Sequence, residues 1–146
     1  MSETIVSMQR AVALAAVLAL LVLPGCGSSG SDGAIRKSLE RGVAQIGEPK
    51  TAKQLHDNLE HTIARLGSER AATAPGRKAR ALAIQGFTWA LRSVEARLEM
   101  TRNDSGNLEA SVRDAQRADR DMRRGAAFLR AAGRALGVRI GKLNGF

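Results

Sequence analysis

The stretch ALAIQGFTWALRSVEARLEM, residues 81–100, decides the fold class. Its large apolar side chains recur every three or four residues, which puts them on one face of an α-helix. They are Ile84, Phe87, Leu91, Val94 and Leu98. A second apolar strip follows another face of the same segment, formed by Leu82, Trp89, Ala96 and Met100. A helix that is apolar on two sides is typically the most buried one. We therefore expect residues 77–102 to form the central helix of a bundle.

Three more segments carry the same periodicity. The first covers residues 34–45 and ends before Gly47-Glu48-Pro49. The second begins with Thr51-Ala52-Lys53-Gln54, a capping-box pattern. The last starts at Leu108 and ends at either Leu136 or Ile140. Short connections make neighbouring helices antiparallel. The sequence predicts an all-α fold, a small antiparallel bundle of three to four helices, in which the short first helix folds onto the other three.

The composition agrees with one helical domain. The chain has 146 residues, no Tyr and one Cys. Strand formers are scarce, and a single Cys excludes an internal disulfide. The net charge is +9, and it stays +9 without the first 25 residues, because Glu3 and Arg10 cancel. A basic balance indicates anionic partners. Compositional drift in a GC-rich genome would also enrich Arg, so both explanations stay open.

The N-terminal region has the pattern of a secretory signal. Residues 11–23, AVALAAVLALLVL, form an uninterrupted apolar run that follows Arg10. A helix of this length rises about 20 Å, whereas a bilayer core is about 30 Å thick. The run is therefore too short for a comfortable membrane span, and it fits the apolar region of a signal peptide.

The apolar run ends in Leu23-Pro24-Gly25-Cys26. This resembles the lipobox of bacterial lipoproteins, an aliphatic residue and two mostly small residues before a Cys. The resemblance implies that the Cys26 thiol is acylated with diacylglycerol and that a signal peptidase cuts between Gly25 and Cys26. Residues 1–25 would then be the signal peptide, 26–33 a lipidated Gly/Ser tether, and 34–146 the basic helical-bundle domain. The mature protein would sit at the cell membrane or outer membrane, facing outside the cytoplasm.

One cluster has the residue types of metal ligands, His56-Asp57-Asn58-Leu59-Glu60-His61. His56 and Glu60 are four residues apart, as are Asp57 and His61, so each pair shares a helix face. The two His diverge by about 140° at 100° per residue, so they cannot grip one ion jointly. The cluster matches neither HExxH nor HxxEH. The more ordinary interpretation is a polar face opposite Leu55, Leu59 and Ile63.

Other catalytic patterns are missing from the sequence. Lipidation would consume Cys26, which excludes thiol catalysis, a zinc cage and c-type haem attachment. The glycines do not have the order of a phosphate-binding loop, and no nucleophile elbow accompanies either His. We therefore expect a protein that is not an enzyme and that uses no cofactor.

The C-terminal region carries cations without acidic partners. Residues 123–146 contain Arg123, Arg124, Arg130, Arg134, Arg139 and Lys142. Either they complement a helix C-terminus, or they contact an anionic membrane surface. The preceding run, RDAQRADRDMRR at 113–124, is typical of a solvated face, with Glu109–Arg113 and Asp119–Arg123 as pairs at four. We expect no nucleic-acid partner, because of the predicted export and the scarcity of aromatic side chains.

Together these patterns predict a non-catalytic, lipid-anchored envelope protein whose bundle binds a protein partner or an anionic surface. The alternative is a small helical metal- or ligand-binding protein that uses the cluster at 56–61.

Overall fold

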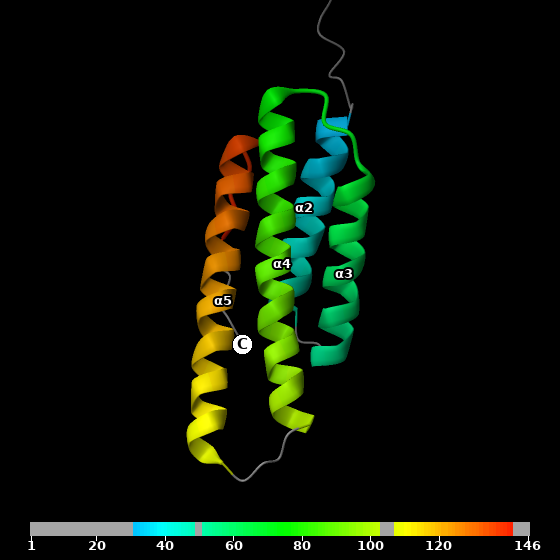
Figure 1. Cartoon of the computed structure of the whole chain (residues 1–146). Helices are drawn as coiled ribbons and strands as arrows, with labels where there is room; N and C mark the ends of the chain where they lie inside the picture. Colours follow the sequence, from blue (N-terminus) through cyan, green and yellow to red (C-terminus); the bar gives the residue numbers. More distant parts are fainter. Residues whose placement is uncertain (1–30, 49–50, 103–106, 142–146) are drawn as a thin grey trace, which may run out of the picture.

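The computed structural model describes residues 31–48, 51–102 and 107–141. Within these ranges the chain forms four α-helices and no strand: α2 (Ser31–Gly47), α3 (Ala52–Ser68), α4 (Ala74–Arg102) and α5 (Leu108–Ala135). They make an antiparallel bundle (Figure 1), which confirms the all-α prediction. None of these helices is apolar over a length that would cross a membrane. The predicted signal peptide, Cys26 and Lys142 lie outside the described residues.

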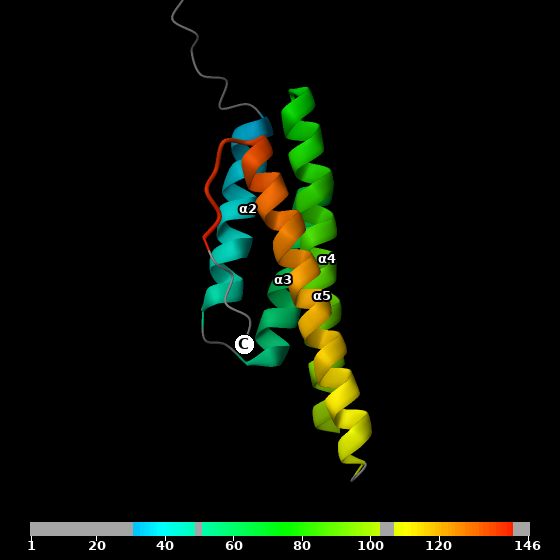
Figure 2. The same cartoon turned by 90° about the vertical axis from the view of Figure 1, so that its left-hand side faces the viewer.

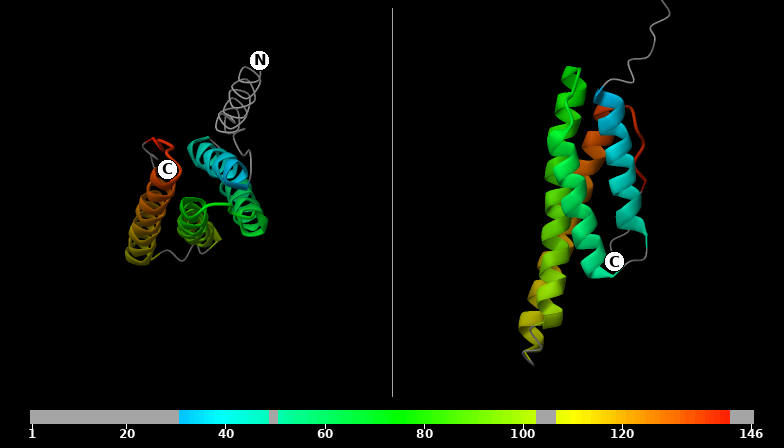
Figure 3. Two further views of the ribbon diagram at one scale, coloured as in Figure 1. Left: turned by 90° about the horizontal axis from the view of Figure 1, so that it is seen from above. Right: turned by 90° about the vertical axis from the view of Figure 1, so that its right-hand side faces the viewer.

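The long α4–α5 hairpin is the frame of the bundle. Its far end projects beyond the shorter α2 and α3 (Figures 1 and 2). Helix α4 contacts all three other helices, as expected for the central one. Helix α2 also packs against α3, α4 and α5, whereas α3 and α5 do not touch. Seen from above, α3 and α5 lie at opposite corners with α2 and α4 between them (Figure 3).

The expectation that α2 merely folds onto a three-helix bundle is therefore wrong. Its apolar face is part of the core, where Ile35 and Leu39 are fully buried and Ile46 nearly so. Without α2, α5 would have only α4 as a neighbour. The first helix is short, but it closes the fourth side of the bundle.

The core forms around Phe87, the largest fully buried side chain. Val94, two turns further along α4, is also buried. The other residues of the predicted strip, Ile84, Leu91 and Leu98, are partly buried and pack against the core. The second strip faces two ways, since Leu82 packs partly buried against the core. Trp89 and Ala96 are only half-buried, because they face the outer seam between α4 and α5. Helix α4 is thus buried on one broad face and not all round.

Helix α2 begins three residues earlier than predicted, inside the segment assigned to the tether. Asp32 in its first turn accepts a hydrogen bond from the Ala72 N–H at 2.9 Å and one from the Thr73 hydroxyl. The Thr73 hydroxyl, with the Ala72 and Thr73 N–H groups, holds the pKa of Asp32 below its usual value of 3.8. These long-range bonds fix the start of α2 against the α3–α4 connection.

Helix α3 begins as the sequence predicts. The Thr51 hydroxyl oxygen accepts from the Gln54 N–H at 3.2 Å, and the Gln54 side chain accepts from the Thr51 N–H at 3.3 Å, which completes the capping box. At the other end, the Arg80 guanidinium on α4 donates to the carbonyl oxygens of Leu66 and Gly67. Both ends of α3 therefore have bonded backbone groups.

Helix α5 ends at Ala135, so its predicted extension to Ile140 is wrong. Gly137 has φ 67°, a left-handed conformation that Gly adopts at low cost, and the Val138 N–H donates to the Gly133 carbonyl at 2.8 Å. The chain then turns back beside α2 (Figure 2). Ile140 packs, partly buried, against the core, so it continues the apolar pattern without continuing the helix.

Candidate functional site

Three carboxylates surround the imidazole of His56 on α3. His56 Nδ1 lies 3.2 Å from Asp57 Oδ1 and 3.8 Å from Glu60 Oε2, and Nε2 lies 3.8 Å from Glu95 Oε1 on α4. The His56 side chain is 24% exposed, against 55% for Asp57. One potential ligand atom from each of His56, Asp57 and Glu60 falls within a 4.8 Å group. The spacing at 56, 57 and 60 thus produces a cluster around one ring.

His61 is not part of this cluster. Its side chain is exposed, and its Nε2 lies 3.4 Å from Nη2 of Arg65, one turn along the same helix. The predicted divergence of the two His is confirmed. Glu95, in contrast, was missed by the sequence analysis. Nothing near position 95 marks it as a ligand, and only the packing of α3 against α4 brings it to His56.

The cluster has two chemical uses. Imidazole nitrogen and carboxylate oxygen are zinc ligands at about 2.0–2.2 Å, so a metal would require small side-chain rotations. Without a metal, a protonated imidazole is a partner for all three carboxylates. Asp57 also accepts from Lys53 Nζ at 2.9 Å. The hydrogen bonds from Lys53 and then His56 lower the pKa of Asp57 below 3.8, so this carboxyl is charged near neutral pH.

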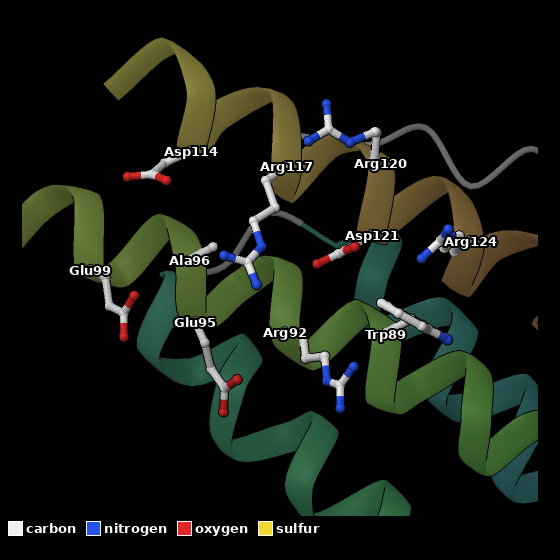
Figure 4. A pocket seen from close by; sticks show the side chains of 10 residues that line it. All are labelled: Trp89, Arg92, Glu95, Ala96, Glu99, Asp114, Arg117, Arg120, Asp121 and Arg124. Carbon is white, nitrogen blue, oxygen red and sulfur yellow. The ribbon is translucent and has the colours of Figure 1, made fainter. Parts of the chain in front are cut away.

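A groove of about 530 Å³ follows the outer seam of α4 and α5 (Figure 4). At one end of the groove the Trp89 ring lies 4.9 Å from the Arg92 guanidinium carbon and 5.0 Å from that of Arg124. Both are cation–π contacts: Arg92 lies on the same helix as Trp89, whereas Arg124 reaches the ring from α5. Four arginines and four carboxylates line the groove, so its formal charge is zero. Arg124 links α5 to α4 through Trp89, and the balanced lining favours neither an anion nor a cation.

The charge run on α5 pairs with α4 and not along α5. Asp119 accepts from Arg97 Nη2 at 2.8 Å across the two helices. The predicted pair Asp119–Arg123 is wrong, since Asp119 pairs with Arg97 and Arg123 has no ion pair within 4 Å among the residues that the structure describes. The Arg97 side chain is 30% exposed, so this ion pair contributes little to the free energy of unfolding. Its main effect is to favour one register of α5 against α4.

The predicted anionic-surface residues fall into two groups. Arg123 and Arg124 lie beside Gly125, which contacts the middle of α4, and Arg124 is engaged with Trp89. Arg130 and Arg134 lie in the last turns of α5, and Arg139 follows the turn, all three exposed. This second group lies at the end of the bundle where α2 and α4 begin (Figure 1).

Cations from other segments join the second group. The start of α4 contributes Arg77 and Lys78, the α3–α4 connection contributes Arg70, and α2 contributes Lys37, all of them exposed. These four cations were not predicted from the sequence, because they lie in segments far from the C-terminal run and join it only in the folded bundle. We call seven of the exposed cations at this end of the bundle the cationic end: Lys37, Arg70, Arg77, Lys78, Arg130, Arg134 and Arg139. Comparison of the chain with protein-family models, curated proteins and solved structures finds no match.

Proposed function

We propose that the protein is a non-catalytic envelope lipoprotein: Cys26 carries the lipid, and the helical bundle binds a protein partner or an anionic surface next to the membrane. The single observation behind this is the short distance along the chain between the lipobox and the bundle. Helix α2 begins at Ser31, five residues after Cys26. Five residues reach at most about 18 Å even when fully extended.

The first turn of α2 is not free to swing away from the bundle. Asp32 bonds to Ala72 and Thr73, so the chain enters the fold at a fixed point. A lipid on Cys26 would therefore hold one defined end of the bundle near the bilayer. Two acyl chains give stable anchoring, whereas one gives marginal binding.

The interior of the bundle is mostly apolar. Its core is built from aliphatic side chains, alanines and Phe87. Two of its buried hydroxyls are used structurally: Ser38 donates to Glu69 at 2.6 Å, and Thr62 donates to the Asn58 carbonyl at 2.9 Å. The exposed charges carry the chemistry that a partner would meet.

Lipidation is tested on protein isolated from its native envelope. We expect intact-mass analysis to show that residues 1–25 are absent and that the sulfur of Cys26 is acylated. Cys26→Ser is expected to accumulate as the full-length precursor without fatty acid, because the thiol must be acylated before the signal peptide is cleaved. Ser29→Ala, in the same Gly/Ser segment, serves as the control and should mature normally. Native protein that retains Met1 and carries no fatty acid would contradict the proposal.

A second candidate function is divalent-metal binding by His56, Asp57 and Glu60, favoured by their ligand atoms within 4.8 Å. Unlike the set expected from sequence, this one excludes His61. If zinc binds, a concentration 100-fold above Kd stabilises the fold by about 2.7 kcal/mol, which raises the Tm. His56→Ala should abolish the rise, and His61→Ala should preserve it. This candidate is eliminated if zinc leaves the Tm unchanged, or if His56→Ala and His61→Ala lose the zinc-dependent rise in Tm equally.

A further inference from the structure

The charge of the bundle is strongly uneven along its length. When each helix is cut at its midpoint, the half that contains the start of α2 comprises described residues 31–40, 61–88 and 122–141. It holds twelve Lys and Arg but only three Asp and Glu. The opposite half, with the tip of the α4–α5 hairpin, holds eight Lys and Arg and nine Asp and Glu. The net positive charge of the described bundle therefore lies entirely in one half.

The acids of the positive half are already engaged with other groups. Asp32 bonds to the α3–α4 connection, Glu40 pairs with Arg36 at 3.1 Å, and Glu69 accepts from Ser38. None of the seven residues of the cationic end has an ion pair within 4 Å to an acid in the part of the chain that the structure describes. Arg77 lies near enough to Asp32 to help lower the pKa of that carboxyl, and the charges of the other six are directed at the solvent or at a partner.

Neither ordinary explanation of the basic charge fits this arrangement. A compositional excess of Arg would not remove acids from the same end of α3, α4 and α5, whose halves at 61–68, 74–88 and 122–135 contain none. The helix dipole favours cations at the C-terminus of α5, which accounts for Arg134. It disfavours cations at a helix N-terminus, yet Arg77 and Lys78 lie in the first turns of α4. The cations gather according to their place in the bundle and not according to their place on a helix.

We infer that the cationic end docks onto the anionic phospholipid headgroups of the leaflet that holds the lipid of Cys26. This inference rests on the proposed function and adds the orientation: the bundle stands on the membrane and presents the α4–α5 hairpin outward. The cationic end includes the point where the chain enters α2 (Figure 1). The connection to Cys26 spans at most about 18 Å, and electrostatic attraction acts over about 8–10 Å. The nearest anionic surface is thus the bilayer itself.

The test uses the full chain with Cys26→Ser, so that no acyl chain contributes to binding. Partition is measured onto phosphatidylcholine vesicles with and without phosphatidylglycerol. A variant of the cationic end is compared with a control that removes the same charge from exposed sites in the opposite half. The first carries Arg77→Gln, Lys78→Gln, Arg130→Gln and Arg134→Gln. The control carries Arg41→Gln, Arg102→Gln, Arg113→Gln and Arg120→Gln.

Each cation close to an anionic surface raises the partition coefficient about fivefold. The four substitutions at the cationic end should therefore lower the partition coefficient by more than about a hundredfold. The control should keep most of the phosphatidylglycerol-dependent binding, and high salt should abolish that binding in the parent chain. The apolar leader is common to all variants and cancels in the comparison. Far-UV circular dichroism and Tm verify that both variants are folded.

Equal loss in the two variants would show that total charge and not its position matters, which overturns the inference. A parent chain whose partition does not increase when phosphatidylglycerol is added overturns it as well. Because this assay lacks the acylated thiol, its failure leaves the lipidation result standing. Conversely, an unacylated native protein would leave a positive vesicle result intact.

Discussion

Phe87→Ala is expected to lower the free energy of unfolding by about 3–5 kcal/mol, the range for truncation of a buried aromatic side chain. Phe87 is fully buried at the centre of the core. A Cβ placed on Gly42 of α2 would lie 2.5 Å from Phe87 Cζ and 2.8 Å from Thr62 Cγ2 of α3. The ring thus fills the space where α2, α3 and α4 meet. Truncation would leave a cavity bordered by three helices.

Urea denaturation and thermal melting followed by circular dichroism measure this effect. For a domain of this size, a loss of 3 kcal/mol lowers the Tm by more than about 10 °C. Leu108→Ala is the control, because that side chain is 78% exposed and its removal should change stability by at most about 0.5 kcal/mol. A cost below about 1 kcal/mol for Phe87→Ala would mean that α2 does not pack on α4 as described.

Local patterns predicted the parts of the fold that depend on neighbours in sequence. The capping box at Thr51 and Gln54 needs only a turn of helix, and it forms as expected. The three-and-four spacing also identified Phe87 and Val94 as core positions. Periodicity alone could not distinguish an apolar strip that faces the core from one that faces a seam. Trp89 is therefore half-buried, in spite of its place in a regular strip.

The features that sequence reasoning missed depend on distant segments. The start of α2 is fixed by the hydrogen bonds that Asp32 accepts from the N–H groups of Ala72 and Thr73, which are 40 and 41 positions further along the chain. Glu95 reaches His56 only through the packing of α3 on α4. The cationic end combines residues from four separate segments. Antiparallel packing of the helices brings these residues to the same end of the bundle. One signal was visible in the sequence: no acid occurs at 70–94 or 122–146.

The second large effect is expected at the contact between α4 and α5, where the two backbones touch. A Cβ on Gly125 would lie 2.7 Å from the Gly86 carbonyl oxygen and 3.1 Å from the Ala90 nitrogen. Both atoms belong to the backbone, so no side-chain rotation relieves the overlap and the helices must separate. Gly125→Ala should therefore cost about 1–3 kcal/mol in net stability, even though Ala is the better helix former by about 1 kcal/mol.

Gly67→Ala in α3 provides the matched control, because a Cβ there has no heavy atom within 4 Å. It should stabilise the fold by up to about 1 kcal/mol, so the same substitution changes sign with position. Gly86→Ala should also destabilise the fold, since a Cβ there would lie 2.7 Å from Cγ of the fully buried Leu129 and 3.0 Å from the Gly125 carbonyl oxygen. Denaturant midpoints of the three variants measure these changes. If Gly125→Ala stabilised the fold instead, α4 and α5 would have to lie further apart than described. The α4–α5 register that brings Arg130 and Arg134 to the same end as Arg77 would then lose its support.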